Sequence, residues 1–402
     1  MTTLCLHTAH FPYGTGEQFI ETEIKYLANA FEKVVIIPNN PKGKKRIVPK
    51  NAEILIPDYS GYSTTKGIKN IGTWLFSCLP DTLKSNNKIL TLSTLLRAGY
   101  QAEILFHSLK HNKLINNTIH YTYWFNEQST LLSILKSKKK INGFISRAHR
   151  FDLYEDRNKE GYIPFRKFQL KNVSRLYLIS KNGLEYIKSK YPKYQHKYQL
   201  SYLGIENNHP LNPTIPDSNE YLMVSCSRVV DIKRVHLIVE AISKITDFHI
   251  RWVHFGDGPL LNEVKELAKK ILPDNIKTEF KGIVPNQVVL QYFQNNFVDC
   301  FINTSSSEGL PVSIMEATGY GIPVLATNVG GTNEIVNNET GILLPAHPEP
   351  IKIAQNLEEI FSNYSRKADF RQKVYNYWNN HFNAEINYQK FTETLKKSVT
   401  YR

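Results

Sequence analysis

Short apolar runs alternate with stretches of helical periodicity along most of the chain. Residues 17–31 and 260–271, for example, repeat apolar positions every three or four residues, which predicts helices. Strands that alternate with helices build parallel sheets covered on both faces, and apolar runs of four to six residues suit strands buried on both sides. The pattern therefore predicts an α/β protein, with strands at residues 3–8, 33–38, 52–57, 118–124, 142–149, 175–180, 221–227, 248–256, 277–283, 298–304, 323–327 and 341–345.

The segment 204–220 interrupts this pattern. It contains three prolines and four asparagines with almost no apolar periodicity, which is typical of a linker. A chain of 402 residues is also too long for one ordinary domain. We therefore predict two doubly wound domains, the first at residues 1–203 and the second from residue 221, with ligands bound in a cleft between them.

The charge is distributed unevenly between the two halves of the chain. The net charge is +14, but residues 1–200 contain 31 Lys and Arg against 14 Asp and Glu, whereas residues 201–402 contain 19 against 22. This excess favours an anionic partner of the first half, namely nucleic acid, a membrane surface or a phosphate-bearing substrate, over a merely basic surface. Residues 60–116 mix aromatic, apolar and basic residues. We expect them to pack against the first domain, and an interfacial membrane contact is the alternative.

The chain shows no pattern of a signal peptide or of a membrane span. Its first residues lack a basic region followed by a long apolar stretch, and no run approaches about 18 apolar residues. The four cysteines stand far apart and form no CxxC pair. This usage favours reduced thiols in a cytoplasmic protein over a disulfide framework or a zinc site.

Candidate chemistry is concentrated in residues 305–345. Glu308 lies in a turn-rich loop after the predicted strand 298–304, and Glu316 lies at the start of the helix that follows. That edge of a doubly wound sheet is where ligands bind, and helix N-terminal amides can receive an anion there. The spacing of the two residues alone has little specificity, and a capping box with Ser313 is an alternative role for Glu316. We favour a ligand role for both carboxylates.

The segment SSSEGLPVSIMEATGYGIPVLATNVGGTNEIVNNETGILLP resembles the glutamate-pair region of the retaining glycosyltransferases of family 4, which have the GT-B fold. That region has the ordered elements E-G-[FL], E-A, G-x-P-V, G-G-x-x-E and G-x-L. The matching positions here are Glu308, Gly309, Glu316, Ala317, Gly321, Pro323, Val324, Gly330, Gly331, Glu334, Gly341 and Leu343. The resemblance implies a GT-B protein, with two Rossmann-like domains that face each other across a cleft.

The resemblance is dense over residues 220–390. It implies that the basic pair Arg228 and Lys233 meets the donor diphosphate, and that Gly256, Gly282 and Ile283 lie in turns near the nucleotide. It also implies a closing helix at residues 381–402 that crosses back onto the first domain, which bounds the second domain at residues 221–380.

The resemblance is sparser in the first domain. Gly14 and Gly16 lie in a predicted strand-to-helix loop, and we expect their backbone amides to face the donor rather than to form an ordinary turn. The segment SRAHRFDLYEDR resembles the family's His-x-x-Asp segment and aligns His149 with its cleft-lining histidine. We assign three residues to the acceptor side: Glu17, Arg147 and Asp152.

The implied reaction transfers a sugar from a nucleotide-sugar, so negative charge grows on the leaving diphosphate. Fixed cations lower the barrier for such a step, and arginine and lysine bind phosphate in different geometries. Glu316 would accept hydrogen bonds from the ribose and Glu308 from the sugar, while the amides of Gly309 and Leu310 reach the donor. The predicted catalytic residues are His149, Glu308, Arg228 and Lys233. The sequence has no D-x-D motif and no clustered His or Cys ligands, so we expect neither a metal nor a cofactor.

The resemblance also implies the partners. We expect a UDP-sugar donor, preferred over GDP by family frequency alone, and a glycan or polyprenyl-diphosphate-linked acceptor of bacterial surface polysaccharide synthesis. The expected location is cytoplasmic, with the anionic inner face of the cell membrane as a candidate contact. Two alternatives stay open: a GT-B nucleotide-sugar epimerase, and a non-enzymatic basic protein that binds polyanions or membranes. The sequence contains no recognised nucleic-acid module, so we expect no nucleic-acid partner.

Overall fold

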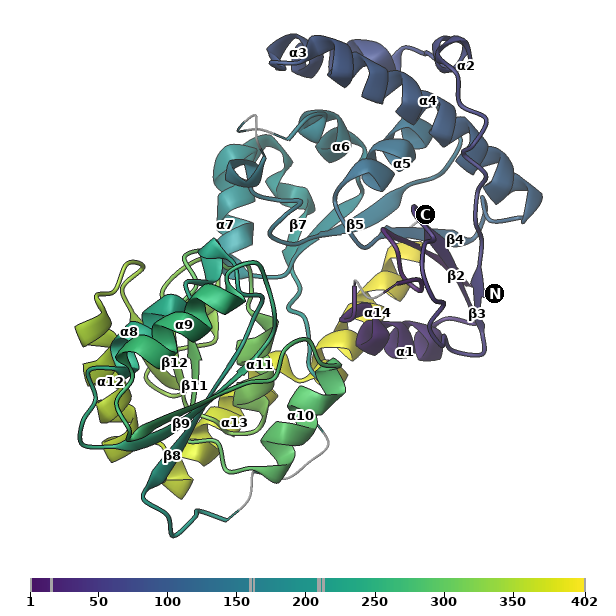
Figure 1. The fold of residues 1–402 in the computed structure, drawn as a ribbon. Helices are drawn as coiled ribbons and strands as arrows, with labels where there is room; N and C mark the ends of the chain where they lie inside the picture. The colour runs from purple at the N-terminus through teal and green to yellow at the C-terminus, as the bar shows by residue number, and fades with distance from the viewer. Residues whose placement is uncertain are drawn as a thin grey trace. The chain divides into compact units, whose positions relative to one another are not determined.

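The computed structural model describes residues 2–14, 17–158, 161, 163–207, 211 and 214–400, and it divides the chain into two compact units (Figure 1). Unit 1 comprises Met1–Gly204 together with Asn387–Arg402, and unit 2 comprises Ile205–Ile386. Nearly all of the last helix, α14 (Ala384–Thr400), therefore belongs to the same compact unit as the first strand.

Unit 1 contains a seven-stranded parallel sheet in the order β3-β2-β1-β4-β5-β6-β7. Its strands are β1 (Thr3–Thr8), β2 (Lys33–Pro38), β3 (Ala52–Ile54), β4 (Thr118–Thr122), β5 (Phe144–Ala148), β6 (Arg175–Leu178) and β7 (Tyr198–Leu200). Its helices, besides α14, are α1 (Ile20–Ala30), α2 (Thr64–Lys69), α3 (Trp74–Lys84), α4 (Lys88–His111), α5 (Glu127–Ser137), α6 (Arg166–Asn172) and α7 (Lys181–Lys190), with short 3-10 turns at Glu155–Arg157 and Pro192–Lys197.

Two apolar cores cover the two faces of this sheet. Because side chains alternate along a strand, β1 directs Cys5 to the core under α4 and α5, and Leu4 to the opposite core. The opposite core contains Leu27 of α1 and Phe391 and Leu395 of α14. The last helix is thus an integral part of unit 1.

Unit 2 contains a six-stranded parallel sheet in the order β10-β9-β8-β11-β12-β13. Its strands are β8 (Glu220–Cys226), β9 (His249–Phe255), β10 (Ile276–Phe280), β11 (Cys300–Asn303), β12 (Val324–Thr327) and β13 (Gly341–Leu344). Its helices are α8 (His236–Ile242), α9 (Leu261–Ile271), α10 (Asn286–Asn295), α11 (Val312–Gly319), α12 (Pro350–Asn363) and α13 (Ala368–Phe382), with 3-10 turns at Asp231–Lys233 and Thr332–Glu334.

Both sheets reverse their strand order once. The reversal lies between β1 and β4 in unit 1 and between β8 and β11 in unit 2. In doubly wound sheets the loops that leave the carboxyl ends of such a strand pair diverge to opposite faces and open a crevice for a ligand. These two places are therefore where functional side chains are expected.

The structure confirms the α/β prediction in detail. All twelve predicted strands are present, and the two helices named from periodicity appear as α1 and α9. The three-residue strand β7 was not predicted, because it is too short to show a pattern. Part of the predicted linker, at residues 208–210 and 212–213, lies outside the described residues.

Candidate active site

The predicted ligand-binding residues of unit 2 lie at its switch point. The loop after β8 carries Arg228 and Lys233, and the loop after β11 carries Glu308. The two strands are parallel neighbours, so their following loops meet at one edge of the sheet. Two of the three residues are in direct contact, because Lys233 Nζ lies 2.5 Å from Glu308 Oε1.

The backbone around Glu308 is held by the two glycines that follow β12. A Cβ atom at Gly330, which has φ +57°, would lie 1.9 Å from the carbonyl oxygen of Glu308, so only glycine fits there. The N–H of Gly331 donates to the carbonyl of Gly309 at 2.7 Å. Asn303, from the end of β11, donates to Glu308 Oε1 at 3.3 Å. Gly330 and Gly331 thus pack directly against the loop that carries the carboxylate of Glu308.

Two backbone donors stand next to this carboxylate. Within the described ranges, no oxygen accepts a hydrogen bond from the N–H of Gly309 or of Leu310. They come just before α11, whose N-cap Pro311 makes no side-chain capping bond. A carboxylate beside unused N–H groups at a helix start suits a ligand that has both hydroxyls and negative charge.

Arg234 positions Lys233, and sequence reasoning missed it. Arg234 adopts a left-handed backbone conformation with φ 48°, which turns its guanidinium back onto the neighbouring loops. Its Nε donates to the carbonyl of Thr304 at 2.8 Å, and its Nη2 donates to those of Ser305 at 3.0 Å and Ala346 at 2.8 Å. The β8 loop is therefore fastened to the β11 loop. The only signal in the sequence was a third basic residue beside the predicted pair.

Arg228 is exposed, and no ion pair or hydrogen bond to a described residue engages its side chain. The turn after β9 packs on the same loop, since a Cβ atom at Gly256 would lie 1.9 Å from the carbonyl oxygen of Ser227. The N–H of Gly256 donates to the carbonyl of Gly282 at 2.9 Å, and the next residue, Ile283, is 83% exposed. Because its amide is occupied, Gly256 shapes this loop and does not offer a free donor.

Glu316 is buried in α11 and faces α10. Its Oε1 accepts a hydrogen bond from Asn286 Nδ2 at 2.9 Å. The capping-box alternative is wrong, because α11 begins at Val312 and no side chain caps its N-terminus. Burial raises the pKa of Glu316 to about 7, and the bond from Asn286 opposes this rise.

We expect Glu316→Gln to change the pH dependence of stability. The folded state holds the Glu316 proton more tightly than the unfolded chain, so wild-type stability falls as the pH rises from about 4.3 to about 7. The variant lacks this proton-linked contribution and should become more stable relative to wild type across that window, by about 3–4 kcal/mol at most. Urea unfolding of both proteins at several pH values measures the difference. A difference that does not vary with pH would contradict the assignment.

In unit 1, Glu17 holds the loop between β1 and α1 instead of facing a ligand. Its carboxylate accepts the N–H groups of three successive residues, Ala9 at 3.0 Å, His10 at 2.7 Å and Phe11 at 2.6 Å, and also the indole N–H of Trp124. With its oxygens occupied and 8% of its surface exposed, Glu17 is a positioning residue. This corrects the prediction of a direct acceptor contact.

The glycine loop of unit 1 also differs from the prediction. Gly14 has φ +67°, as a tight turn requires, but its N–H donates to the carbonyl of Lys44 at 3.0 Å. That amide is not available to a phosphate, which corrects the donor-binding assignment of Gly14. Gly16 lies outside the described residues.

Arg147 is buried inside unit 1. Its Nη1 lies 2.9 Å from Glu23 Oε2, and neither side chain is exposed. The guanidinium also lies over the ring of Phe391 of α14, with its carbon 4.2 Å from the ring centroid. This corrects the prediction that Arg147 contacts an acceptor, because a fully enclosed guanidinium cannot reach one.

His149 follows β5 and lies on an aromatic surface. The centroid of its ring is 4.4 Å from that of Trp124 and 4.8 Å from that of Tyr123. The side chain is 93% buried, and neither ring nitrogen has a hydrogen-bond partner among the described residues. Asp152 fixes the loop around it, accepting the N–H of His149 at 2.7 Å and that of Phe125 at 2.6 Å. Its Nδ1 lies 3.8 Å from Asp152 Oδ2, so Nε2, which makes no hydrogen bond to a described residue, is the nitrogen left for a ligand.

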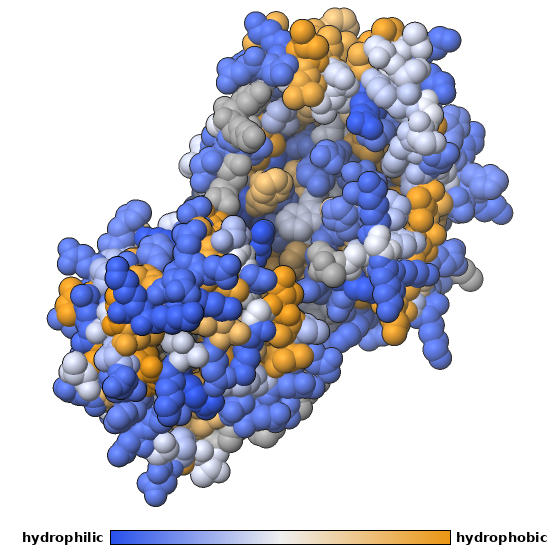
Figure 2. Space-filling model, in the orientation of Figure 1, coloured by the Kyte–Doolittle hydropathy of each residue, from blue (hydrophilic) through white to orange (hydrophobic). Residues whose placement is uncertain are grey.

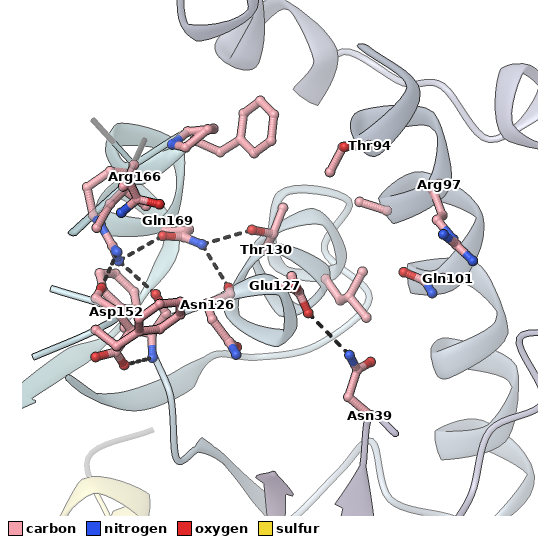
Figure 3. Close-up of a pocket in the computed structure, with 18 of the residues that line it drawn as sticks. Asn39, Thr94, Arg97, Gln101, Asn126, Glu127, Thr130, Asp152, Arg166 and Gln169 are labelled. Carbon is pink, nitrogen blue, oxygen red and sulfur yellow. Dashed lines mark hydrogen bonds between the residues drawn. The ribbon is translucent and has the colours of Figure 1, made fainter. Parts of the chain in front are cut away.

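Next to this loop, unit 1 contains a solvent-open cavity of about 880 Å³ (Figure 3). It lies over the carboxyl ends of β2, β4 and β5, and α4 provides the opposite wall. Figure 3 shows Arg97 and Gln101 extending from α4 on one side, and Arg166 and Gln169 on the other. Six amide side chains and four aromatic rings line it: Asn39, Asn40, Gln101, Asn126, Asn158, Gln169, Tyr59, Phe125, Phe151 and Phe165.

Most charged groups of this cavity already have partners. Arg166 donates to the carbonyl oxygens of Phe125 and Asp152 and to the side chain of Gln169. The exposed carboxylate of Glu127 accepts a hydrogen bond from Asn39 Nδ2 at 3.2 Å. The lining is therefore largely amide and aromatic, and its more exposed cation is Arg97. Amide groups both donate and accept hydrogen bonds, and aromatic rings offer flat apolar surfaces.

The fold of the two units defines the class of protein. Each unit is a doubly wound α/β sheet, and unit 2 brings a basic residue and a carboxylate together at its switch point. Among the described residues, no group of three or more His, Cys, Asp or Glu side chains is arranged to hold a metal ion. The same residues include no helix that has both the length and the apolar character to cross a membrane.

A family model described as "Glycosyl transferases group 1" matches residues 212–377 of this chain. Protein CapJ of Staphylococcus aureus is 29% identical over 176 residues, which are 43% of this chain and 43% of that protein. The chain spans less than half of the length of the first curated relatives that it matches.

Solved structures agree over the whole chain. The lipopolysaccharide outer core galactosyltransferase WaaB in its apo form aligns with a TM-score of 0.71 at 16% identity, covering 99% of both chains. Alr3699/HepE of Anabaena in complex with UDP aligns with a TM-score of 0.66 at 14% identity, covering 99% of this chain and 100% of that one. These structures are GT-B glycosyltransferases, and the predicted GT-B fold is confirmed.

Proposed function

We propose that this protein is a retaining glycosyltransferase of family 4 that transfers a sugar from a UDP-sugar to a glycan or lipid-linked glycan in bacterial surface polysaccharide synthesis. The observation that carries the proposal is the contact of Lys233 with Glu308 at the switch point of unit 2, beside the unused amides of Gly309 and Leu310. It provides a cation, a carboxylate and two N–H donors in one place.

These groups suit a nucleotide-sugar. In the transfer, the bond from the anomeric carbon to the diphosphate breaks, and UDP leaves with the electron pair. A bond to the acceptor oxygen forms, and the proton of that hydroxyl passes to the leaving phosphate. Lys233, together with the exposed Arg228, would stabilise the charge that develops on the diphosphate. Glu308 would then exchange its bond with Lys233 for sugar hydroxyls, and Glu316 would accept from the ribose.

The choice of UDP and of the setting rests on relatives. HepE is described in complex with UDP, and WaaB is named for the outer core of lipopolysaccharide. The acceptor glycan is assigned to the cavity of unit 1, because amide side chains bind hydroxyls and aromatic rings stack on the apolar faces of sugars. His149 is proposed to contact the reacting groups from unit 1. The reaction needs neither a metal nor a cofactor in this proposal, and its place is the cytoplasmic face of the membrane.

The first test is thermal unfolding in the presence of UDP, GDP and ADP. At about 100 times its dissociation constant, a ligand stabilises the folded state by about 2.7 kcal/mol. We expect UDP to raise the unfolding midpoint of wild type, and to raise it far less in an Arg228→Ala/Lys233→Ala variant. A variant at two exposed lysines of α9, Lys269→Ala/Lys270→Ala, is the control and should respond like wild type.

If none of the three nucleotides shifts a cooperative transition, the donor site is wrong and a basic polyanion-binding protein becomes the better description. An epimerase of the same fold would respond to UDP as well. It would convert the UDP-sugar without any acceptor, so a product analysis with and without added glycans separates the two enzymes.

A further inference from the structure

The cavity of unit 1 continues into a basic loop at the carboxyl end of β2 (Figure 1). Asn39 and Asn40 line the cavity, and the segment that follows carries three lysines in four residues: Lys42, Lys44 and Lys45. All three side chains are exposed, and none of them makes a hydrogen bond or an ion pair to a described residue. We call residues 42–45 the lysine loop.

The backbone of the lysine loop is held in place. The carbonyl of Lys44 accepts the N–H of Gly14 at 3.0 Å, and the N–H of Arg46 donates to the carbonyl of Pro12 at 2.8 Å. A Cβ atom at Gly43, which has φ +100°, would lie 2.9 Å from Cα of Gly14, so the loops that follow β1 and β2 are in close contact. The lysine loop therefore lies at the carboxyl edge of the sheet, which is the edge that carries the cavity.

The first of these lysines lies close to the cavity lining. Consecutive Cα atoms are about 3.8 Å apart, so Lys42 lies within about 8 Å of Asn40. The N–H of Lys42 donates to the carbonyl of Asn40 at 2.9 Å, which turns the chain at this point. Figure 2 shows that the surface of unit 1 is hollowed, with hydrophilic residues around much of the hollow.

Inside the cavity, Arg97 of α4 supplies a further positive charge (Figure 3). Its side chain is exposed, and its guanidinium carbon lies 5.7 Å from the centroid of the Tyr62 ring. An aromatic ring attracts a cation but does not neutralise its charge. Within the described ranges, no carboxylate forms an ion pair with Arg97.

The exposed acidic groups near these cations are fewer, and both are already engaged. Glu127 accepts a hydrogen bond from Asn39 Nδ2 at 3.2 Å, as Figure 3 shows. Asp58, which precedes the lining residue Tyr59, accepts the N–H of Ser60 at 3.0 Å. Three lysines and one arginine against two carboxylates leave an excess of two positive charges at this edge of unit 1.

We infer that the acceptor is an acidic glycan, in a step that rests on the proposed function. Its carboxylate or phosphate groups bind Arg97 in the cavity and the lysine loop at the edge of the cavity. An arginine can bind two oxygens of such a group at once, and lysines attract it as point charges. The amides and rings of the lining bind the hydroxyls and the apolar faces of the sugars. A neutral glycan would use the amides and rings but none of the four cations.

Calorimetric binding of short glycans to the full chain tests the inference. Tetragalacturonate and its neutral methyl ester report recognition of a carboxylate, and maltotetraose 6-phosphate and maltotetraose report recognition of a phosphate. We expect the acidic member of at least one pair to bind about tenfold or more tightly than its neutral partner. Arg97→Gln should weaken the binding of that acidic probe by about 10–100-fold, the effect of hydrogen bonds to a charged group, and change that of the neutral partner by less than about twofold.

The lysine loop has a variant of its own, Lys42→Ala/Lys44→Ala/Lys45→Ala. It should weaken the binding of the same acidic probe by about threefold to tenfold, because exposed charges each contribute little. The loss should shrink as the salt concentration is raised, since salt screens exposed charges. Equal affinity for the two members of both pairs would overturn the inference.

The matched control is Lys110→Ala/Lys171→Ala/Lys188→Ala. It removes three exposed lysines from the last turns of α4, α6 and α7. Each of these helices leads into the next strand, so its last turn lies at the amino edge of the sheet, opposite the cavity. This variant should bind the acidic probe like wild type. A loss equal to that of the lysine-loop variant would reduce the effect to net charge and overturn the inference.

The UDP response of the same variants separates the inference from the proposed function. Stabilisation by UDP without a preference for either acidic probe would leave the donor site standing and remove the acidic acceptor. A preference for an acidic probe without a response to any nucleotide would leave acidic-glycan binding standing but would reject the glycan as an acceptor. A UDP response that falls in the lysine-loop variant would assign these lysines to the donor and overturn their role here.

Discussion

Replacing Lys233 by alanine is expected to lower the rate of sugar transfer by about 10²–10³-fold, because loss of one group that stabilises developing charge has an effect of this size. Lys233 is held 2.5 Å from Glu308 at the switch point of unit 2, so its charge lies where the diphosphate is proposed to bind. UDP release from the UDP-sugar that wild type uses fastest measures the rate. Lys233→Arg should retain part of it, since the charge remains while the geometry changes.

The matched control is Lys277→Ala. Lys277 also forms an ion pair within unit 2, with Glu220 at 3.2 Å, but its side chain is 72% exposed and lies on the edge strand β10. Its removal should leave the rate within about twofold of wild type, as exposed ion pairs contribute little. A Lys233→Ala protein that folds, responds to UDP and transfers sugar at nearly the wild-type rate would remove Lys233 from the mechanism.

The fold was largely predictable because its strands are buried on both faces. Such strands are continuous apolar runs, and they alternate with helical segments at intervals that a parallel sheet requires. The order in which the strands pair could not be predicted from the apolar runs, because an apolar run does not show which other strand it will pair with. Neither was β7, whose three residues Tyr198–Leu200 include an exposed glutamine and follow a basic turn.

In the candidate site, the sequence identified residues on the two loops that meet but could not show how those loops are joined. Lys233 and Glu308 are 75 positions apart, and only the adjacent placement of β8 and β11 brings them together. Arg234 joins the two loops through the backbone carbonyl oxygens of Thr304 and Ser305. Because every residue type has a backbone carbonyl, no particular residue in the sequence indicates such a contact. The cavity of unit 1 is equally hidden, since its lining comes from separate loops and helices between Asn39 and Gln169.

The errors in unit 1 have a common physical cause. Glu17 begins the predicted helix 17–31 and Arg147 lies near the end of the predicted strand 142–149, and charged residues are usually exposed or functional. In this unit both are buried with partners distant in the sequence: Trp124 for Glu17, and Glu23 and Phe391 for Arg147. A sequence pattern reports the charge of a residue but not whether a later segment supplies its counter-charge.

Arg147→Ala is accordingly expected to lower the free energy of unfolding of unit 1 by about 3–5 kcal/mol, the effect of leaving one partner of a buried ion pair alone. Glu23 would keep a single hydrogen bond, from the hydroxyl of Tyr121 at 3.0 Å. The variant also removes the guanidinium that lies over Phe391, so α14 should loosen from the sheet. Amide hydrogen exchange of β5 and α14 measures the change locally, which matters because two units need not unfold together.

The control is Arg46→Ala, which breaks the ion pair of Arg46 with Glu21 on the same helix, α1, at 2.7 Å. There the arginine and glutamate side chains are 17% and 50% exposed, and the guanidinium also lies over the ring of Phe11, so a loss of about 1–2 kcal/mol is expected, smaller than that of Arg147→Ala. The loss in Arg147→Ala should also depend on pH. Burial already raises the pKa of Glu23, and without Arg147 the rise is larger, so the folded variant binds a proton that the unfolded chain releases. Its deficit should therefore shrink as the pH falls from about 8 toward about 5. A deficit that is the same at both pH values, or no larger than that of Arg46→Ala, would mean that Arg147 contributes through packing alone.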